Sequence, residues 1–484
     1  MTPPAPPAPP APPASPDPPI RLSKSRFVAG LQCHKQLWWK VHERGAPELV
    51  ADPALQNRFD QGNEVGLLAR RYVPGARYEA RVVADDTTID VDILDGSTLV
   101  EVKASNRVKK EHIPDVAVQV HVLRQAGLTV PRAEVMHLNP ACRFPNLDDL
   151  FVREDVTEKV ELFLPVVAGE IAAQLASLAG PLPDVPIGDH CTRPYPCPFL
   201  DRCWPKLPEH HISTLYTIQR RKVEEYQARG IETIGDVPSM LELSVIHARQ
   251  VKAVTTGQMV VEPTLGPRVA EFVGPLAFLD FETVSYAIPR FLGCRPWENM
   301  PVQFSVHRES GKHGITHAAF LADGPADPRP ALARRLVEAC AGARRVVAYH
   351  ATFERECLRN LAAGVPELAP ELQAIEGKLI DLLPLVRNHI YHPDFGGSFS
   401  IKQVLPALVP ALSYADLPIN DGETASLELM RLLFDEQLKG EERAKLRRAL
   451  LAYCERDTWA MVKLLERVRD LAAGVGRAAQ LELF

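Results

Sequence analysis

Four of the cysteines are placed so that their thiolates could share one metal group. Cys33 stands alone near the start of the chain, and Cys191, Cys197 and Cys203 follow much later at steps of six residues in a proline-rich segment. Four thiolates can hold an iron–sulfur cluster or a zinc ion. We expect a reducing compartment, where clustered cysteines are more often metal ligands than disulfides. The alternative is a set of buried free thiols.

A second group of reactive side chains lies on two predicted strands joined by the turn Asp95-Gly96. Asp92 belongs to the first strand, and Glu101 and Lys103 lie two residues apart on the second, so the latter two share a face of the sheet. The carboxylates and the backbone carbonyl of Val102 offer hard oxygen ligands to a divalent ion. Lys103 could activate water or stabilise a phosphate undergoing substitution. The alternative is a surface hairpin of alternating charge.

A third group begins on an apolar strand that carries Asp280 and Glu282 on one face. A buried strand gains nothing from two like charges unless a cation compensates them. Tyr453 and Asp457 lie four residues apart in a predicted helix and therefore share a face of that helix. Glu354 lies near the start of another predicted helix. The pattern indicates a second site for divalent ions.

The hydrophobic pattern of the first half predicts the elements that would position the first two groups. Helices are expected over residues 21–45, 56–72, 111–126 and 158–178, and strands over residues 78–83, 88–94, 98–104, 130–139 and 150–155. This order of strands and helices is typical of an α/β domain.

The second half predicts another α/β arrangement after a helical segment over residues 209–262. The turn at residues 228–231 fits a helix-hairpin-helix element or a plain helical linker. Strands are expected over residues 276–281, 302–307, 317–321 and 345–349, and helices over residues 330–339, 352–363 and 441–468. Ser400 precedes a further short helix. Asp381 and Lys402 lie between the motifs, each either a site residue or an ordinary surface or helix-end residue.

Composition sets the class of protein. The chain has 484 residues, 46% hydrophobic and 24% charged, which is ordinary for two or three globular domains. A net charge of -6 neither indicates nor excludes nucleic-acid binding, because a local basic groove can lie on an acidic protein. Residues 1–20 repeat proline and alanine and are expected to form a disordered tail. Without a long apolar span, we expect a cytoplasmic protein with no membrane association.

Residues 21–205 resemble the RecB-like branch of the PD-(D/E)XK nucleases. The resemblance rests on Asp92, the strand with Glu101 and Lys103, and Gln119 on the following helix. It implies that Asp92 and Glu101 hold Mg²⁺ or Mn²⁺ and that these four residues are catalytic. Many relatives carry a histidine on an early helix, where this chain offers Glu64 as a further metal ligand.

Several of these relatives wrap a [4Fe–4S] cluster around the nuclease core, with one cysteine before the core and three after it. Cys33, Cys191, Cys197 and Cys203 follow this order. The resemblance therefore favours an iron–sulfur cluster with a structural role. Zinc remains the alternative, because spacing alone does not choose the metal.

The later motifs resemble the DEDD 3′–5′ exonucleases of the DnaQ-like, RNase H-fold class, in the branch with a tyrosine in the last motif. The resemblance implies that Asp280, Glu282, Glu354 and Asp457 hold two divalent ions and that Tyr453 orients the attacking water. The glutamate at position 354 departs from the usual aspartate. Residues 208–484 also resemble a bacterial uncharacterised-domain family that has this exonuclease core.

The expected fold class is α/β, with a PD-(D/E)XK core and an RNase H-like core joined by a small helical region. The expected domains are a tail over residues 1–20, a nuclease with its cysteine cluster over 21–208, a linker over 209–262 and an exonuclease over 263–484. We expect a metal-dependent nuclease that processes DNA ends in repair, recombination or defence. The alternatives are a ribonuclease and a nucleic-acid-binding scaffold with decayed sites. No P-loop motif occurs, so unwinding would need a helicase partner. The sequence does not indicate an oligomeric state.

Overall fold

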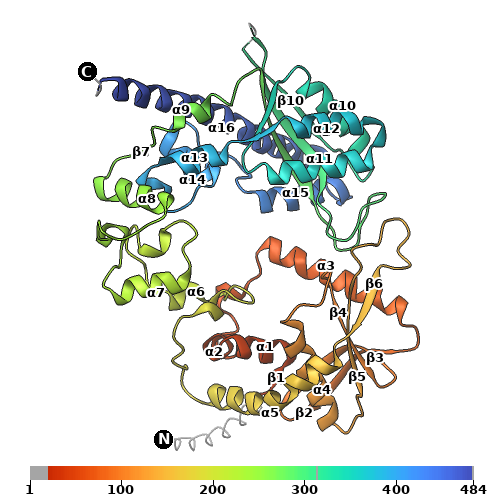
Figure 1. Cartoon of the computed structure of the whole chain (residues 1–484). Coiled ribbons are helices and arrows are strands. Elements are labelled where there is room, and N and C mark those ends of the chain that lie inside the picture. The colour runs from red at the N-terminus through yellow and green to blue at the C-terminus, as the bar shows by residue number, and fades with distance from the viewer. Residues whose placement is uncertain (1–19, 312–313, 482–484) are drawn as a thin grey trace, which may run out of the picture. The chain divides into compact units, whose positions relative to one another are not determined.

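The computed structural model describes residues 20–311 and 314–481, with side chains as far as residue 474 (Figure 1). The tail predicted for residues 1–20 therefore lies outside the described residues except for Ile20. The described chain is mixed α/β, as expected, and divides into two compact units. The first unit takes the chain up to residue 50 and residues 64–138 and 151–204, and the second takes residues 51–63, 139–150 and the chain from residue 205.

The first unit is built on a six-stranded sheet with the order β1-β3-β4-β5-β6, in which β2 also pairs with β3. The strands are β1 (Leu22–Ser23), β2 (Arg77–Ala84), β3 (Thr87–Asp95), β4 (Thr98–Lys103), β5 (Arg132–Leu138) and β6 (Phe151–Asp155). Strands β2, β3 and β4 are antiparallel neighbours, whereas β5 runs parallel to β4. Each predicted strand of this half is present, with its ends displaced by a few residues at most.

Helices of residues 20–204 are α1 (Lys24–Gln32), α2 (His34–His42), α3 (Pro53–Ala69), α4 (His112–Gln125), α5 (Thr157–Ala179) and α6 (Leu200–Cys203). Helix α4 makes the crossover between the parallel strands β4 and β5, and it packs on the core that contains Leu99 of β4. Glu101 lies two residues beyond Leu99 and shares its face of the strand.

The single helix predicted over residues 21–45 is wrong in one respect, because Cys33 interrupts it. Cys33 has extended backbone angles (φ −166°, ψ 119°), and it caps the end of α1 and the start of α2. Its amide still donates to the Ala29 carbonyl at 2.9 Å. The apolar periodicity continues through the break, so the sequence pattern alone did not locate it.

Helix α5 is long and apolar enough, by length and composition alone, to cross a membrane, with a mean hydropathy of 1.7. Within the described residues it is the single helix with this property. Its buried residues Val160, Val167 and Ile171 pack in the same core cluster as α4. The core helix of a globular domain can have the same composition, and 22% of the apolar window of α5 is buried.

The second unit contains a five-stranded sheet with the order β10-β9-β8-β11-β12. The strands are β8 (Leu276–Val284), β9 (Met300–Glu309), β10 (Ile315–Leu321), β11 (Arg345–Ala348) and β12 (Leu379–Asp381), and β7 (Val260–Val261) pairs separately with β13 (Ile390–Tyr391). Strands β8, β9 and β10 are antiparallel, whereas β11 and β12 run parallel to β8. The four strands predicted here are confirmed, and β12 was not expected.

The helices of the second unit are α7 (Arg220–Ala228), α8 (Val245–Thr256), α9 (Leu265–Val269), α10 (Arg329–Cys340), α11 (Thr352–Gly364), α12 (Ala369–Gly377), α13 (Leu383–His389), α14 (Ile401–Leu408), α15 (Gly422–Phe434) and α16 (Gly440–Leu481). Residues 209–262 contain α7 and α8 with much irregular chain, so this segment is less helical than predicted. Helices α12, α13 and α15 were not expected.

Two hydrophobic cores lie on opposite faces of this sheet. Leu279 and Phe281 of β8 pack with residues of α10 and α11, whereas Phe278 packs with residues of α16. Because side chains alternate along a strand, Asp280 and Glu282 share the face of Phe278. The fold therefore presents these two carboxylates to α16, the long helix at the C-terminal end of the chain (Figure 1).

Candidate metal centres

The first carboxylate group lies in the first unit, at the ends of β3 and β4. The antiparallel hairpin brings Asp92 beside β4, and its Oδ2 accepts a hydrogen bond from the Val102 amide at 2.8 Å. Glu101 is buried, with 1% of its side chain exposed, whereas Asp92 is partly buried. The two acids predicted from the hairpin are therefore neighbours.

Two lysines surround Glu101. Lys103 Nζ lies 2.7 Å from Glu101 Oε1 and also contacts Asp115 on α4. Lys24 Nζ, from the start of α1, lies 2.9 Å from the same oxygen and 4.0 Å from Asp92 Oδ1. Sequence reasoning identified Lys103 but missed Lys24 and Asp115. No local pattern marks Lys24, because it reaches Glu101 from a helix 77 positions away.

Gln119 completes this group from α4. Its Nε2 donates to Glu101 Oε2 at 2.7 Å and to the Asp115 carbonyl at 3.0 Å, while its Oε1 is buried and has no hydrogen-bond partner in the described chain. Glu64 lies exposed on α3. Its role as a metal ligand stays a prediction.

The pKa values of Asp92 and Glu101 are shifted in opposite directions. Burial, helped by the charge of Glu101, raises the pKa of Asp92 to about 7. Burial would also raise the pKa of Glu101, but Lys103 and Lys24 outweigh it and hold the pKa of Glu101 well below its usual range. Glu101 is therefore a permanent anion, and Asp92 is held between the protonated and charged forms near neutral pH.

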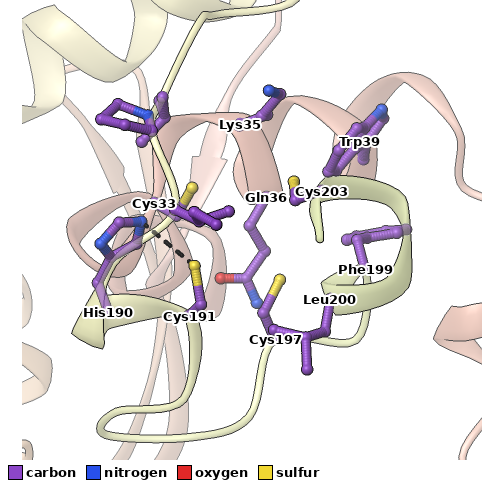
Figure 2. Close-up of a pocket in the computed structure, with 13 residues that line it drawn as sticks. Cys33, Lys35, Gln36, Trp39, His190, Cys191, Cys197, Phe199, Leu200 and Cys203 are labelled. Atoms are coloured by element: carbon purple, nitrogen blue, oxygen red, sulfur yellow. Dashed lines mark hydrogen bonds between the residues drawn. The ribbon is translucent and has the colours of Figure 1, made fainter. Parts of the chain in front are cut away.

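The four predicted cysteines line one cavity of the first unit. Cys33 lies at the break between α1 and α2, Cys191 and Cys197 lie in the loop before α6, and Cys203 ends α6 (Figure 2). The Gln36 side chain points into the space between the sulfurs, and its Oε1 is buried without a hydrogen-bond partner in the described chain (Figure 2).

Polar contacts fasten the loop with the later cysteines to α1 and α2. Arg202 of α6 pairs with Glu43 and Glu48 at 2.6 Å each, and its guanidinium also lies 5.4 Å from the centre of the Trp39 ring. On the other side, Gln32 Nε2 donates to the backbone carbonyls of two loop residues at 2.7 Å. These contacts bring a distant segment to Cys33 without any bond between the sulfurs.

The distances between the four sulfurs indicate which kind of metal group they could hold. Among the described residues, no three of these sulfurs belong to a set of ligand atoms that all lie within 4.8 Å of one another. Tetrahedral zinc with bonds of about 2.3 Å holds its sulfurs about 3.8 Å apart. Burial, with smaller effects of the other three thiols, raises the pKa of Cys197. A bound cation would reverse this effect by stabilising the thiolate.

The second carboxylate group lies in the second unit. Asp280 and Glu282 of β8 meet Asp457 of α16, and Glu354 comes from the start of α11. Burial, and then the charges of Asp457 and Glu282, raise the pKa of Asp280 well above its usual value. Burial and Asp457 do the same for Glu282. The four acids predicted from three separate motifs therefore act on one another.

The side chain of Glu354 is buried, and its hydrogen bonding within the described residues is incomplete. It is 3% exposed, and its Oε2 is buried without a hydrogen-bond partner within the described residues. Burial raises the pKa of Glu354 to about 8, with a smaller contribution from Asp381. Asp381 itself accepts from the His350 amide at 2.9 Å and the Leu383 amide at 3.0 Å, which is the backbone-capping role.

Two tyrosines and one lysine border the acids. Tyr414 donates to Asp457 Oδ1 at 2.7 Å, and burial raises the pKa of Asp457 to about 6 against this hydrogen bond. Lys402 Nζ donates to the Tyr453 hydroxyl at 3.0 Å and lowers the pKa values of Glu282 and Asp457 from a distance. Sequence reasoning found Tyr453 and noted Lys402, but it missed Tyr414, which lies in a segment with no recognisable motif.

A protein-family model matches the part of the chain that carries three of the four acids of the second group. Residues 277–400 match the family model of a domain of unknown function, DUF2779. The matched segment includes Asp280, Glu282 and Glu354 and ends before Lys402 and Asp457. No curated protein matches the chain.

Proposed function

We propose that the chain is a metal-dependent nuclease with two active sites and that it processes DNA ends in repair, recombination or defence. The observation that carries the proposal is the meeting of four acids, the buried Glu282 and Glu354 and the partly buried Asp280 and Asp457. Lys402 and Arg456 are the cations that act on them. Such a cluster is unfavourable unless protons or cations compensate the charge.

The donor set of the second site fits Mg²⁺ or Mn²⁺, because these hard cations prefer carboxylate oxygens. The unpartnered Oε2 of Glu354 is the kind of oxygen that such an ion requires. Asp280, Glu282, Glu354 and Asp457 would hold the ions. Two divalent ions at such a site activate water and stabilise the leaving oxygen of a phosphodiester.

Residues of the chain perform the remaining tasks at this site. Tyr453, fixed through its hydroxyl by Lys402, would orient the attacking water. Tyr414 fixes the rotamer of Asp457 through its hydrogen bond. The strand order β10-β9-β8-β11-β12, with three antiparallel strands followed by two parallel ones, supports the RNase H-like, DnaQ-type core that the motifs resemble.

The first site supports the same chemistry with a different residue set. Asp92 and Glu101 would hold a divalent ion, Lys103 would bind the scissile phosphate, and Gln119 fixes Glu101. The β3–β4 hairpin, followed by α4 and the parallel strand β5, supports the PD-(D/E)XK core. Two sites on one chain would allow the processing of opposite strands or polarities of DNA.

We further propose that Cys33, Cys191, Cys197 and Cys203 hold a [4Fe–4S] cluster. The four thiols line one cavity, and their sulfurs are spread more widely than a single tetrahedral zinc ion favours. A cluster is larger than one ion and suits wider spacing. Its role would be to fasten the loop before α6 to α1 and α2, so that the first unit closes around its sheet.

The same experiment distinguishes two alternative functions. The substrate could be RNA, since nothing in either site reads the sugar, or the chain could be a nucleic-acid-binding scaffold with decayed sites. The scaffold alternative rests on Glu354, because the related motifs carry aspartate at this position. A helicase partner and a cytoplasmic location remain parts of the proposal.

The proposal is tested with anaerobically purified full-length protein and end-labelled single-stranded DNA and RNA in Mg²⁺ or Mn²⁺. We expect Lys103→Ala and Asp280→Ala each to remove one cleavage activity and the double variant to remove both. Lys206→Ala and Asp148→Ala, which change exposed side chains elsewhere, serve as matched controls. A folded, metal-loaded wild type that binds DNA without cleaving it would refute the nuclease and favour the scaffold.

A further inference from the structure

A second type of ligand cluster lies on the second unit, outside the four acids described above. His307 of β9 and His317 of β10 are direct cross-strand partners, and their rings stack with centroids 4.5 Å apart. Glu455 of α16 reaches the same point. One ligand atom from each of these three side chains lies within 4.8 Å of the other two.

Two hydroxyl groups connect the imidazoles to α16. Thr458 Oγ1 lies 3.1 Å from the backbone carbonyl of Glu455, 2.7 Å from Ser305 Oγ and 2.8 Å from His307 Nδ1. Ser305 Oγ in turn lies 2.9 Å from His317 Nε2. Thr458 is fully buried, whereas the side chain of His317 is 28% exposed, so the network runs from the interior to the surface.

The hydroxyl groups can fix the histidines as ligands, because each hydroxyl has one proton to donate. In the arrangement that suits a metal, Thr458 donates to the Glu455 carbonyl and Ser305 donates to Thr458, while His307 donates through Nδ1 and His317 through Nε2. In that arrangement Nε2 of His307 and Nδ1 of His317 each carry a free lone pair.

A bound cation would accept these lone pairs. Nδ1 of His317 is 3.7 Å from Glu455 Oε1, a separation at which one metal ion can contact both atoms. Histidine ligands in metal sites are commonly fixed in this way by a hydrogen bond to the other ring nitrogen.

We propose that His307, His317 and Glu455 form a binding site for a transition-metal dication of the Zn²⁺ class, distinct from the carboxylate site. Two imidazoles and one carboxylate suit zinc and its neighbours, whereas Mg²⁺ prefers oxygen ligands alone. Three protein ligands leave a coordination position open to water. A bound ion would fasten β9 and β10 to α16, the helix that carries Tyr453 and Asp457.

The site is tested on the full-length protein with Zn²⁺ and Co²⁺ as probes. We expect wild-type protein to bind one more equivalent of Zn²⁺ than His317→Ala or Glu455→Gln, as measured by elemental analysis after dialysis. Bound Co²⁺ should show visible d–d bands without thiolate charge transfer, which distinguishes this site from the cysteine cavity. Thr458→Val keeps the shape of the side chain and should weaken Zn²⁺ binding by about 10–100-fold, as is typical when a second-shell hydrogen bond to a ligand is lost.

Matched controls are available for both ligand variants. His392→Ala changes a histidine whose side chain is 28% exposed, as that of His317 is. Glu466→Gln changes an acid of the same helix as Glu455, with 47% against 51% of the side chain exposed. Both controls should keep the extra equivalent and the Co²⁺ bands, and so should Asp280→Ala.

Two results would overturn the site. Unchanged Zn²⁺ stoichiometry and an unchanged Co²⁺ spectrum in His317→Ala and Glu455→Gln would show that these residues bind no ion. Loss of the extra equivalent in Asp280→Ala alone would assign the ion to the carboxylate site. Thermal melting in excess chelator monitors folding, and His317 and Glu455 were chosen because their side chains are partly exposed.

Discussion

The ammonium group of Lys24 lies 2.9 Å from Oε1 of Glu101 and 3.1 Å from Oε2, so that both carboxylate oxygens are engaged by a lysine from the first helix. The same nitrogen is 4.0 Å from Asp92 Oδ1. A divalent ion held by these two acids needs the same oxygens. Lys24 is therefore an internal cation that competes with the metal proposed for the first site.

Replacing Lys24 with methionine should raise the affinity of the first site for Mn²⁺, because the competing charge is removed. The metal-free protein should lose on the order of 2 kcal/mol of unfolding free energy, less than the about 3–5 kcal/mol typical of a broken buried pair, since Lys103 still compensates Glu101. Calorimetric Mn²⁺ titration in an Asp280→Ala background measures the affinity, and urea unfolding measures the stability.

Lys35→Met is the control for this change, because Lys35 also lies on the early helices but lines the cysteine cavity. An equal or weaker Mn²⁺ affinity in Lys24→Met would mean that Lys24 supports the ion instead of competing with it.

The stability of the metal-free protein should fall as pH rises from about 4.5 to about 8. Burial raises the pKa of Glu354 from 4.5 to about 8, so the folded protein holds a proton that the unfolded chain releases. A raised folded-state pKa gives stability that is present below the unfolded pKa and lost as pH rises through the folded one. The slope is about 1.4 kcal/mol per pH unit for each such proton.

Urea unfolding in chelator at several pH values checks this dependence. Glu354→Gln should reduce the slope over that range by the contribution of one proton, whereas Glu356→Gln, an exposed neighbour on α11, should leave it unchanged. Mn²⁺ should stabilise the wild type more at pH 8 than at pH 5, since the ion replaces protons. A curve of the same slope in Glu354→Gln would assign the pH dependence to other groups.

Replacing Tyr453 with phenylalanine should lower the turnover of the second site by about hundredfold, in the range of a lost proton-handling group. The change removes only the hydroxyl that Lys402 contacts at 3.0 Å. Single-turnover cleavage in a Lys103→Ala background isolates this site, and Mn²⁺ affinity should stay near the wild-type value because the four acids remain. A loss of Mn²⁺ binding with unchanged turnover per bound ion would contradict the orienting role.

Replacing Cys203 with alanine should remove the visible absorption and most of the bound iron from anaerobically prepared protein. It should also lower the unfolding free energy by several kcal/mol, because the binding energy of a structural metal group contributes to folding. Cys340→Ala removes a buried thiol of α10 that lies outside the cavity and should keep the iron. Full iron content in Cys203→Ala would exclude a four-cysteine cluster, and zinc without iron in the wild type would select the alternative metal.

Local sequence patterns were sufficient to identify most residues of the first carboxylate group. Asp92 and Glu101 lie on strands joined by a short turn, and Lys103 follows at a period of two, so pairing of neighbouring strands brings them together. Gln119 lies on the next helix. The right-handed crossover that is usual between parallel strands places this helix over the strand of Glu101. Contacts of this kind depend on short separations, which periodicity and turn residues reveal.

Other residues were beyond sequence reasoning because their partners come from remote elements. Lys24 reaches Glu101 across 77 positions, Tyr414 reaches Asp457 across 43, and His307 meets Thr458 across 151. No periodicity marks such pairs, since each depends on how a helix packs on a sheet. The break at Cys33 was also hidden, because the apolar pattern runs through it.

By itself the sequence determined the mixed α/β character, the principal strands and the chemical types of the candidate ligands, because these follow from local periodicity and from the pKa and charge of single side chains. Only the tertiary structure decided which of these groups share a site, how far each is desolvated and which cation compensates which acid. The physical reason is that burial and Coulomb interactions depend on distances through space, and packing of remote segments sets those distances.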